Sequence, residues 1–235
     1  MDALPDGSDR LLVVNHAERE SVEMFEIGEG ELTWRGCVQA SSESYLNDVA
    51  GTPDGGLVVS VMASQEVLAD VDAMFSGQDT GGHVLHWTPG TDIEELPGTN
   101  LPGPNGIQVD PQGRHVYFAV YTGREVVKYD LREQEVVDQA ELNMAPDNMS
   151  VGADGELYMV GFTTLEGARA CVETALEDCD GPFLIEEVDP DTFEVSSTEV
   201  QGLEEVNSAT VAVPVGDRFL VSSTADNRIL SLPRA

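Results

Sequence analysis

Basic residues are scarce in this chain. Lysine and arginine together number 11 against 44 aspartates and glutamates, which gives a formal net charge of −33, and Lys128 is the only lysine. Recognition of nucleic acid needs clustered lysines and arginines, and an anionic membrane would repel an acidic surface. We therefore expect neither nucleic acid nor a membrane as a partner.

Two explanations compete for the acidic excess. It can be a solvated surface adapted to high salt, where screening removes the repulsion between carboxylates, or it can serve to bind divalent cations. A metal site uses only a few acids. We therefore assign most of the charge to the surface.

A surface of this kind makes stability depend on salt. We expect the melting temperature to rise from low to molar salt, because counter-ions screen the repulsion between the carboxylates. Thermal unfolding followed by circular dichroism over that range measures the effect. A melting temperature that stays flat would contradict the surface explanation.

Long apolar runs and familiar catalytic motifs are also absent. No stretch reaches the roughly 18 apolar residues of a transmembrane helix, and the opening MDALPDGSDR lacks the basic-then-apolar pattern of a leader. The sequence contains no GxSxG elbow, no GxxxxGKS/T phosphate loop, no HExxH motif and no EF-hand loop. The chemistry that depends on these motifs is therefore not indicated.

Only three cysteines occur, and none has the spacing of a zinc site. Cys171 and Cys179 bracket the acidic segment CVETALEDC and could close a local disulfide, which would suit a periplasmic or secreted protein. Two nearby thiols in a cytosolic protein are the alternative. Cys37 lies in an apolar strand pattern and is expected to be a small core residue.

One pattern recurs along the chain: a turn with Asp, Gly or both, followed by an apolar β-run. The turn residues supply the positive φ of tight hairpins, and the β-branched and aromatic runs suit half-buried strands. Further strands follow each run, whereas the best helix candidate, around residues 65–74, is short. The five copies are PDGSDRLLVVNH from Pro5, TPDGGLVVSV from Thr52, DPQGRHVYFAV from Asp110, GADGELYMVG from Gly152 and VPVGDRFLVSS from Val213.

Units of about 40 to 60 residues with up to four antiparallel strands are typical of propeller blades. One small sheet cannot bury both of its faces, so blades stack radially into a ring. A β-sandwich is the alternative, although sandwiches rarely repeat one hairpin signature in this way. We predict an all-β fold with a single β-propeller domain over residues 1–235, of the six-bladed type, with about five blades present.

The two ends of the chain depart from the repeat. The first unit begins directly at its hairpin, without the strand that precedes the turn in the other four, and the last unit has three strands. Propellers often close when one terminus completes the blade begun by the other. The ring is therefore expected to be partial, or closed in an unusual way.

Asparagine and aspartate recur one strand upstream of the turns. Asn47, Asn105 and Asp147 each lie eight residues before the glycine of the following turn. This register places them where the chain enters the innermost strand of a blade, and those entrances converge on the central channel of a propeller. The three side chains should therefore point into one small volume.

Such oxygen ligands suit a hard cation. Ca²⁺ accepts about six to eight oxygens in loose geometry, whereas Mg²⁺ demands a stricter octahedron. Asp48 and Asn148 directly follow two of the predicted ligands and offer further oxygens. Asn and Asp are also common turn formers that cap their own backbone, but three residues in register favour a metal. We predict a Ca²⁺ site built from Asn47, Asp48, Asn105, Asp147 and Asn148.

His16 is the candidate catalytic residue. It ends the apolar run LLVVNH, where a strand emerges at a loop and an imidazole could reach the channel. A histidine titrates near neutral pH and can act as general base for water beside a metal-bound substrate. A surface or structural histidine is the alternative. His83, His86 and His115 fall at outer or alternating strand positions and are interpreted as structural.

Several segments together resemble the paraoxonase/arylesterase family. They are LLVVNHAERESVEMFEI, YLNDVAG, GPNGIQVDPQGRHVYFAV and APDNMSVGADGELYMVG, whose NHxxxxS, LND, NG and DN motifs follow the family's order nearly from end to end. More broadly, the chain resembles the calcium-dependent six-bladed propellers that include gluconolactonases and SMP-30-type lactonases.

The resemblance implies two Ca²⁺ ions in the central tunnel and the hydrolysis of lactones and aryl esters. By motif, the Asn and Asp ligands above would bind the catalytic ion, except Asp48, which would bind the deeper structural ion. His16 would match the second histidine of the family's dyad. Ca²⁺ would polarise the carbonyl and stabilise the oxyanion while histidine-assisted water attacks.

The chain also departs from the family. The family's N-terminal portion, with a Glu and an Asp that bind the ions and the first histidine of the dyad, has no counterpart, and the segment around VSVMAS replaces an Asp-His pair. A site short of one carboxylate is expected to bind Ca²⁺ less tightly. The alternatives to a hydrolase are a non-catalytic binding or scaffold module that Ca²⁺ stabilises, and a propeller similar to strictosidine synthase, which condenses an amine with an aldehyde.

Overall fold

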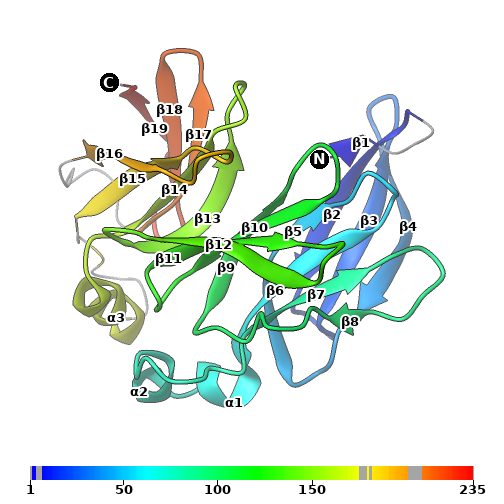
Figure 1. Cartoon of the computed structure of the whole chain (residues 1–235), viewed down its shortest axis with the longest axis horizontal. Helices are drawn as coiled ribbons and strands as arrows, with labels where there is room; N and C mark the ends of the chain where they lie inside the picture. Colours follow the sequence, from blue (N-terminus) through cyan, green and yellow to red (C-terminus); the bar gives the residue numbers. More distant parts are fainter. Residues whose placement is uncertain (1, 4–6, 175–178, 180–181, 201–207, 235) are drawn as a thin grey trace.

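The strands form five antiparallel sheets, each built from a continuous part of the chain (Figure 1). The computed structural model describes residues 2–3, 7–174, 179, 182–200 and 208–234. Within these residues the first four sheets have four strands and the last has three. The prediction of an all-β propeller is confirmed, and the described part of the chain forms five blades.

Each blade takes its strands in chain order. The first has β1 (Asp2–Ala3), β2 (Asp9–Asn15), β3 (Ser21–Ile27) and β4 (Leu32–Gln39), and the second has β5 (Ser44–Gly51), β6 (Leu57–Ser64), β7 (His83–Trp87) and β8 (Glu94–Glu95). The third has β9 (Pro104–Val109), β10 (His115–Val120), β11 (Glu125–Asp130) and β12 (Glu135–Glu141). The fourth has β13 (Ala145–Val151), β14 (Leu157–Phe162), β15 (Phe183–Val188) and β16 (Val195–Val200), and the fifth has β17 (Ala209–Val215), β18 (Arg218–Ser223) and β19 (Leu230–Pro233).

The first strand lies innermost in the second to fifth blades, and in the first blade β2 packs against the neighbouring inner strand. β5 packs against β9, β9 against β13 and β13 against β17, while β2 packs against β5. Figure 1 shows the first and last blades on opposite sides of the molecule, with the other three between them. The sequence predicted no strand before the first hairpin. The structure has β1 at that place, but it pairs with β2 over only two residues.

The hydrophobic core lies in layers between neighbouring blades. Strand β10 is apolar along most of its length because Val116, Phe118 and Val120 pack on the second blade, while Tyr117 and Ala119 pack on the fourth. An unbroken apolar run is typical of a strand that is buried on both faces. The apolar runs of the sequence repeat are therefore the inner parts of stacked sheets.

Three short helices in the described part of the chain gather at one end of the inner strands. α1 (Gln65–Leu68) and α2 (Val71–Met74) follow β6, and α3 (Leu165–Glu173) follows β14. Because β6 and β14 run antiparallel to β5 and β13, their ends lie beside the starts of these inner strands. The predicted helix around residues 65–74 is confirmed as two short helices, whereas α3 was not predicted. No helix among the described residues is long and apolar enough to cross a membrane.

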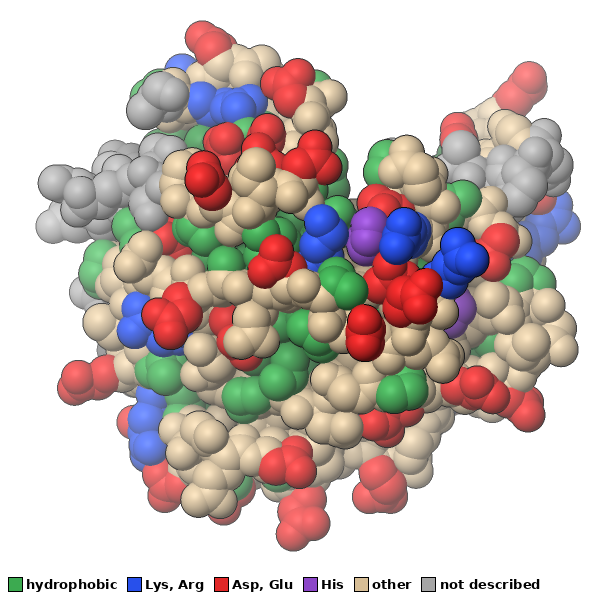
Figure 2. Space-filling view, viewed as in Figure 1, with side chains coloured by type: hydrophobic (Ala, Val, Ile, Leu, Met, Phe, Trp, Pro, Cys, Tyr) green, Lys and Arg blue, Asp and Glu red, His purple; other side chains and the backbone are tan. Residues whose placement is uncertain are grey.

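Acidic side chains are dispersed over the face drawn in Figure 2. They stand among polar and apolar side chains on all of the visible blades and are not collected in a single patch. This distribution agrees with assigning most of the charge to a solvated surface.

Candidate metal centre

Four inner strands share an irregularity in their pairing. In β5 the pairing with β6 breaks at Asn47 and Asp48, and in β9 the pairing with β10 breaks at Asn105. The break in β13 contains Asp147 and Asn148, and β17 has one at the corresponding place. A β-bulge of this kind turns side chains out of the regular alternation of the strand. The constant spacing between ligand and turn in the sequence therefore reflects a bulge repeated from blade to blade.

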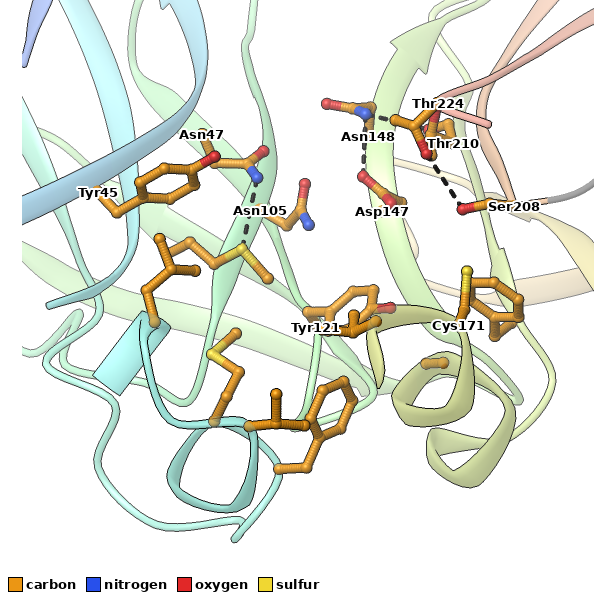
Figure 3. Close-up of a pocket in the computed structure, with 18 residues that line it drawn as sticks. Tyr45, Asn47, Asn105, Tyr121, Asp147, Asn148, Cys171, Ser208, Thr210 and Thr224 are labelled. Atoms are coloured by element: carbon orange, nitrogen blue, oxygen red, sulfur yellow. Dashed lines mark hydrogen bonds between the residues drawn. The ribbon is translucent and has the colours of Figure 1, made fainter. Parts of the chain in front are cut away.

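The bulges bring four of the predicted ligands to one cavity of about 390 Å³. Asn47, Asn105, Asp147 and Asn148 all line it, and Figure 3 shows oxygens of these side chains turned toward a common space. They come from three different blades. The tertiary structure thus produces the convergence that the register predicted.

Asp48, the fifth predicted ligand, joins two inner strands and is not among the residues that line the cavity. Its carboxylate accepts the backbone N–H of Val49 at 2.8 Å and that of Ile107 at 3.0 Å. The Ser60 hydroxyl strengthens this link, because it accepts the Asp48 N–H at 3.0 Å and donates to the Asn105 carbonyl at 2.6 Å. These bonds fix the separation of β5 and β9, and nothing in the local sequence marked Ser60 for that role.

The side-chain oxygen of Asn105 has no hydrogen-bond partner, although the residue is only 2% exposed. A buried acceptor left unpaired costs about 1–3 kcal/mol. The amide group of the same side chain acts on Asp147 and favours its ionised form. The oxygen is therefore left facing the cavity without a protein donor, which suits an atom that binds a cation.

Asn148 orients Asp147 and links β13 to β17. Its Nδ2 donates to Oδ1 of Asp147 at 2.9 Å and to the carbonyl of Thr210 at 3.1 Å. Both donor directions are thus used within the protein, and Figure 3 shows the Asn148 oxygen on the cavity side. Asn148 can offer an oxygen to the same space as Asn105.

The two aspartates of this region resist ionisation. Burial raises the pKa of Asp48 to about 6, against the opposing effect of its two backbone N–H donors. Burial, together with the nearby charge of Asp48, raises the pKa of Asp147 to about 7, while the Asn105 amide acts in the opposite direction. A cation beside these carboxylates would favour their ionised forms.

These raised pKa values make the stability of the metal-free protein depend on pH. An unfolded aspartate ionises near pH 3.9, so the stabilisation from the protonated folded forms is complete below about that pH. It is lost as the pH rises through about 6 and about 7. We expect the melting temperature of chelator-treated protein to fall between about pH 4 and pH 7. The fall should be smaller in the Asp147→Asn variant. An equal dependence of melting temperature on pH in the two proteins would show that Asp48 and Asp147 are not responsible.

Apolar side chains from the helices close the rest of the cavity. The wall is formed by Leu68 of α1, Val71 and Met74 of α2, and Ala168 and Val172 of α3. Figure 3 shows α3 and the helical segment opposite it on one side of the polar cluster. The cavity therefore has a polar floor and an apolar wall.

Helix α3 was missed because its sequence signal is short. The Thr164 hydroxyl accepts the Gly167 N–H at 3.1 Å, which is a capping bond that a threonine before LEGARACVE could have suggested. A disulfide between Cys171 and Cys179 pins the helix, and Cys171 also lines the cavity. The structure thus contains the disulfide that the sequence left open against free thiols, which agrees with a periplasmic or secreted protein.

His16 lies behind Tyr45, which lines the cavity, and is not itself a lining residue. The two rings stack with centroids 4.4 Å apart and planes 4° from parallel. Nδ1 of His16 is 3.0 Å from each carboxylate oxygen of Glu20, and Glu20 also accepts the Leu46 N–H at 3.1 Å. An ionised carboxylate only accepts, so Nδ1 carries the proton and Nε2 presents a lone pair. The catalytic role of His16 stays a prediction.

The donor set is poor in charge for a metal centre. Over the described ranges, no three His, Cys, Asp or Glu side chains come together as a possible metal cluster. The predicted ligands at the cavity are instead three amides and one carboxylate, and Asp48 lies nearby. Amide and carboxylate oxygens fit a hard cation such as Ca²⁺, but few charges imply modest affinity.

Comparisons with known proteins agree with this fold. Residues 3–172 match the family model described as the SMP-30/Gluconolactonase/LRE-like region, and no curated protein sequence matches the chain. The periplasmic gluconolactonase PpgL of Pseudomonas aeruginosa has a TM-score of 0.61 at 16% identity, with 98% of this chain and 64% of that chain covered. Regucalcin from Agrobacterium tumefaciens, a calcium-binding protein, has a TM-score of 0.52 at 18% identity, with 92% and 69% covered. Virginiamycin B lyase from Staphylococcus aureus has a TM-score of 0.56 at 13% identity, with 97% and 67% covered.

Identities this low show a shared fold, and the chain spans about two thirds of the length of these structures. The family match is stronger evidence, because it covers most of the chain and includes β5, β9 and β13 with every predicted ligand. It does not single out the paraoxonase/arylesterase branch. The chain belongs to the SMP-30/gluconolactonase/LRE-like family.

Proposed function

We propose that this chain is a calcium-dependent hydrolase of lactones or aryl esters, of the paraoxonase/arylesterase type. The observation that carries the proposal is the buried, unpartnered oxygen of Asn105 at the floor of an otherwise largely apolar cavity. Membership of a family named for gluconolactonase, and the shared fold of PpgL, support a lactonase-type reaction.

The polar floor would hold the ion. Oxygens for the ion would come from Asn47, Asn105, Asp147 and Asn148, which line one space. Asp48 could bind a second ion only if its hydrogen bonds to the backbone rearranged. Bound Ca²⁺ would supply Lewis-acid polarisation of a substrate carbonyl. Proton transfer and the orientation of the substrate would depend on the side chains of the protein.

His16 is the proposed general base. Glu20 fixes its tautomer through Nδ1, and stacking on Tyr45 fixes the plane of the ring. Nε2 is then free to accept a proton from a water molecule on the Tyr45 side of the cavity. Glu20 stabilises the resulting imidazolium, because it is a buried carboxylate already bonded to that ring.

The apolar wall favours substrates with an apolar body. Hydroxyl groups placed against Leu68, Val71 and Met74 would lose their hydrogen bonds to water without gaining protein partners. An alkyl or aryl group would gain from burial at the same place. We therefore expect alkyl lactones or aryl esters to be better substrates than polyhydroxylated sugar lactones.

Hydrolysis measured with and without chelator tests the proposal. The panel contains alkyl γ- and δ-lactones, phenyl acetate and gluconolactone, and each rate is corrected for spontaneous hydrolysis. We expect turnover of the apolar substrates that disappears with chelator and returns with Ca²⁺. A folded protein that binds Ca²⁺ but shows no chelator-sensitive turnover would contradict the proposal and favour a non-catalytic module.

A further inference from the structure

A second cavity, of about 320 Å³, lies between the third and fourth blades. The last residues of β9 and β13, Val109 and Val151, line it. Asn105 and Asp147, near the first residues of the same strands, line the candidate metal centre. The second cavity therefore lies at the opposite end of the inner strands and has no part in the proposed hydrolysis.

Basic side chains gather at this cavity, although they are rare in the chain. Lys128, Arg114 and His115 all line it, in a protein with only 11 lysines and arginines and four histidines. Figure 2 shows Lys, Arg and His side chains in a row near the middle of the visible face. The single lysine of the sequence thus lies where the structure also places an arginine and a histidine.

The carboxylates beside Arg114 and His115 are engaged within the protein. Asp130 bonds Arg114 through Nε and a terminal nitrogen, both at 2.8 Å, and accepts two backbone N–H groups of the following turn. Asp110 accepts Nδ1 of His115 and the backbone N–H of Arg114. These carboxylates hold the two basic groups at the cavity wall. Arg114 keeps further N–H groups, since a guanidinium has five.

Lys128 is held firmly and keeps donors to spare. Its Nζ donates to the Pro190 carbonyl at 2.7 Å and lies 5.8 Å from the ring centroid of Tyr117 and 6.0 Å from that of Phe193. An ammonium has three N–H groups, and this bond uses one of them. The aromatic rings keep the charge half-buried, where solvent screens it less than on the surface. Two carboxylates lie near this charge: Asp191, which lines the exposed rim of the cavity, and Asp189, which interacts electrostatically with Lys128.

Apolar side chains complete the cavity. Val109, Val151 and Leu157 line it together with two prolines, Pro111 and Pro190. Its size is near the lower limit of pockets that enclose small organic ligands. An inorganic anion would use the basic groups but leave this apolar surface uncovered.

We propose that this cavity binds a small organic carboxylate. The anionic head lies on Lys128 and Arg114, and the apolar body covers Val109, Val151 and Leu157. The cavity gathers three of the few basic side chains of a strongly acidic protein, so a carboxylate finds N–H donors here that most of the acidic surface does not offer.

Benzoate is the probe, and neutral benzamide is its match in shape. Protein is treated with chelator and dialysed, so that the metal centre offers no cation, and binding is followed by calorimetry and by NMR. Benzoate should bind saturably and at least about tenfold more tightly than benzamide, as expected for a charge-assisted contact. Its affinity should fall with added salt.

Three variants locate the site. Lys128→Met keeps an unbranched side chain beside the two rings and should weaken benzoate binding by about tenfold. Asp191→Asn removes the carboxylate at the rim of the cavity and should strengthen benzoate binding severalfold. Arg35→Met removes an exposed arginine, paired with Glu26 on the first blade, and should leave it unchanged.

Circular dichroism and melting temperature establish that each variant is folded, and Lys128→Gln replaces Lys128→Met if the latter does not fold. Equal affinities for benzoate and benzamide would overturn the proposal. So would undiminished benzoate binding by the folded Lys128 variant. Inorganic phosphate that binds as tightly as benzoate would overturn it too, because the apolar surface would then have no role.

Discussion

Replacing Asn105 by alanine is expected to weaken Ca²⁺ binding by at least the roughly 10- to 100-fold that loss of a supporting group costs a metal site. Asn105 lies on β9, between the two other strands that carry predicted ligands, and its oxygen faces the cavity without a protein partner. The proposed calcium-dependent hydrolysis should fall to the level of the metal-free protein. Calorimetric titration with Ca²⁺ and the lactone assay measure the two effects.

The same substitution should cost little in the metal-free protein. Alanine removes a buried acceptor that has no partner. This gain offsets part of the stability that is lost with the interaction between the Asn105 side-chain amide and Asp147. The change in melting temperature should therefore be larger with Ca²⁺ than without it. The control is Asn100→Ala, because Asn100 is an exposed asparagine whose amide donates to a surface glutamate, Glu95, at 2.9 Å. A folded Asn105→Ala protein with unchanged Ca²⁺ affinity would exclude this oxygen as a ligand.

Replacing Gly106 by alanine is expected to lower the free energy of unfolding by about 3 kcal/mol, at the upper end of the usual cost of overpacking. A Cβ at this position would lie 2.3 Å from the backbone nitrogen of Met149 and 2.7 Å from the Cα of Asn148. These are backbone atoms of β13, which cannot rotate aside as a side chain could. β9 and β13 would have to separate.

The separation should also reach the metal centre, because Asn105 and Asn148 lie on the two strands that are forced apart. We therefore expect weaker Ca²⁺ binding as well as a melting temperature lower by roughly 2–4 °C for each kcal/mol lost. Gly28→Ala is the matched control, since a Cβ there comes no closer than 3.6 Å, to the carbonyl of Glu31, and should change stability by less than about 0.5 kcal/mol. If Gly106→Ala had the same melting temperature as Gly28→Ala, the strands β9 and β13 would be shown to move apart without cost.

The register of the ligands could be predicted because it is local and repeated. In the second, third and fourth blades the inner strand runs from its bulge to the next hairpin over the same number of residues, so Asn47, Asn105 and Asp147 keep a constant distance from their turns. The turn chemistry and the apolar runs are likewise local, and they indicated the propeller. Asp48 shares the register of Asn148, yet its carboxylate bonds the backbone of β9. That difference depends on a neighbouring strand and not on the sequence around Asp48.

The sequence by itself therefore determined the repeat, the all-β propeller and the set of oxygen-bearing residues at the start of the inner strands. Only the tertiary structure decided that the Asn105 oxygen has no partner, that α3 and its disulfide form part of the cavity wall, and that Lys128 lies beside Arg114. The physical reason is the range of the contacts. Turns and strands depend on residues that are close in the chain, whereas both cavities form where consecutive blades pack and bring together residues that are far apart in the sequence, and no local pattern records that packing.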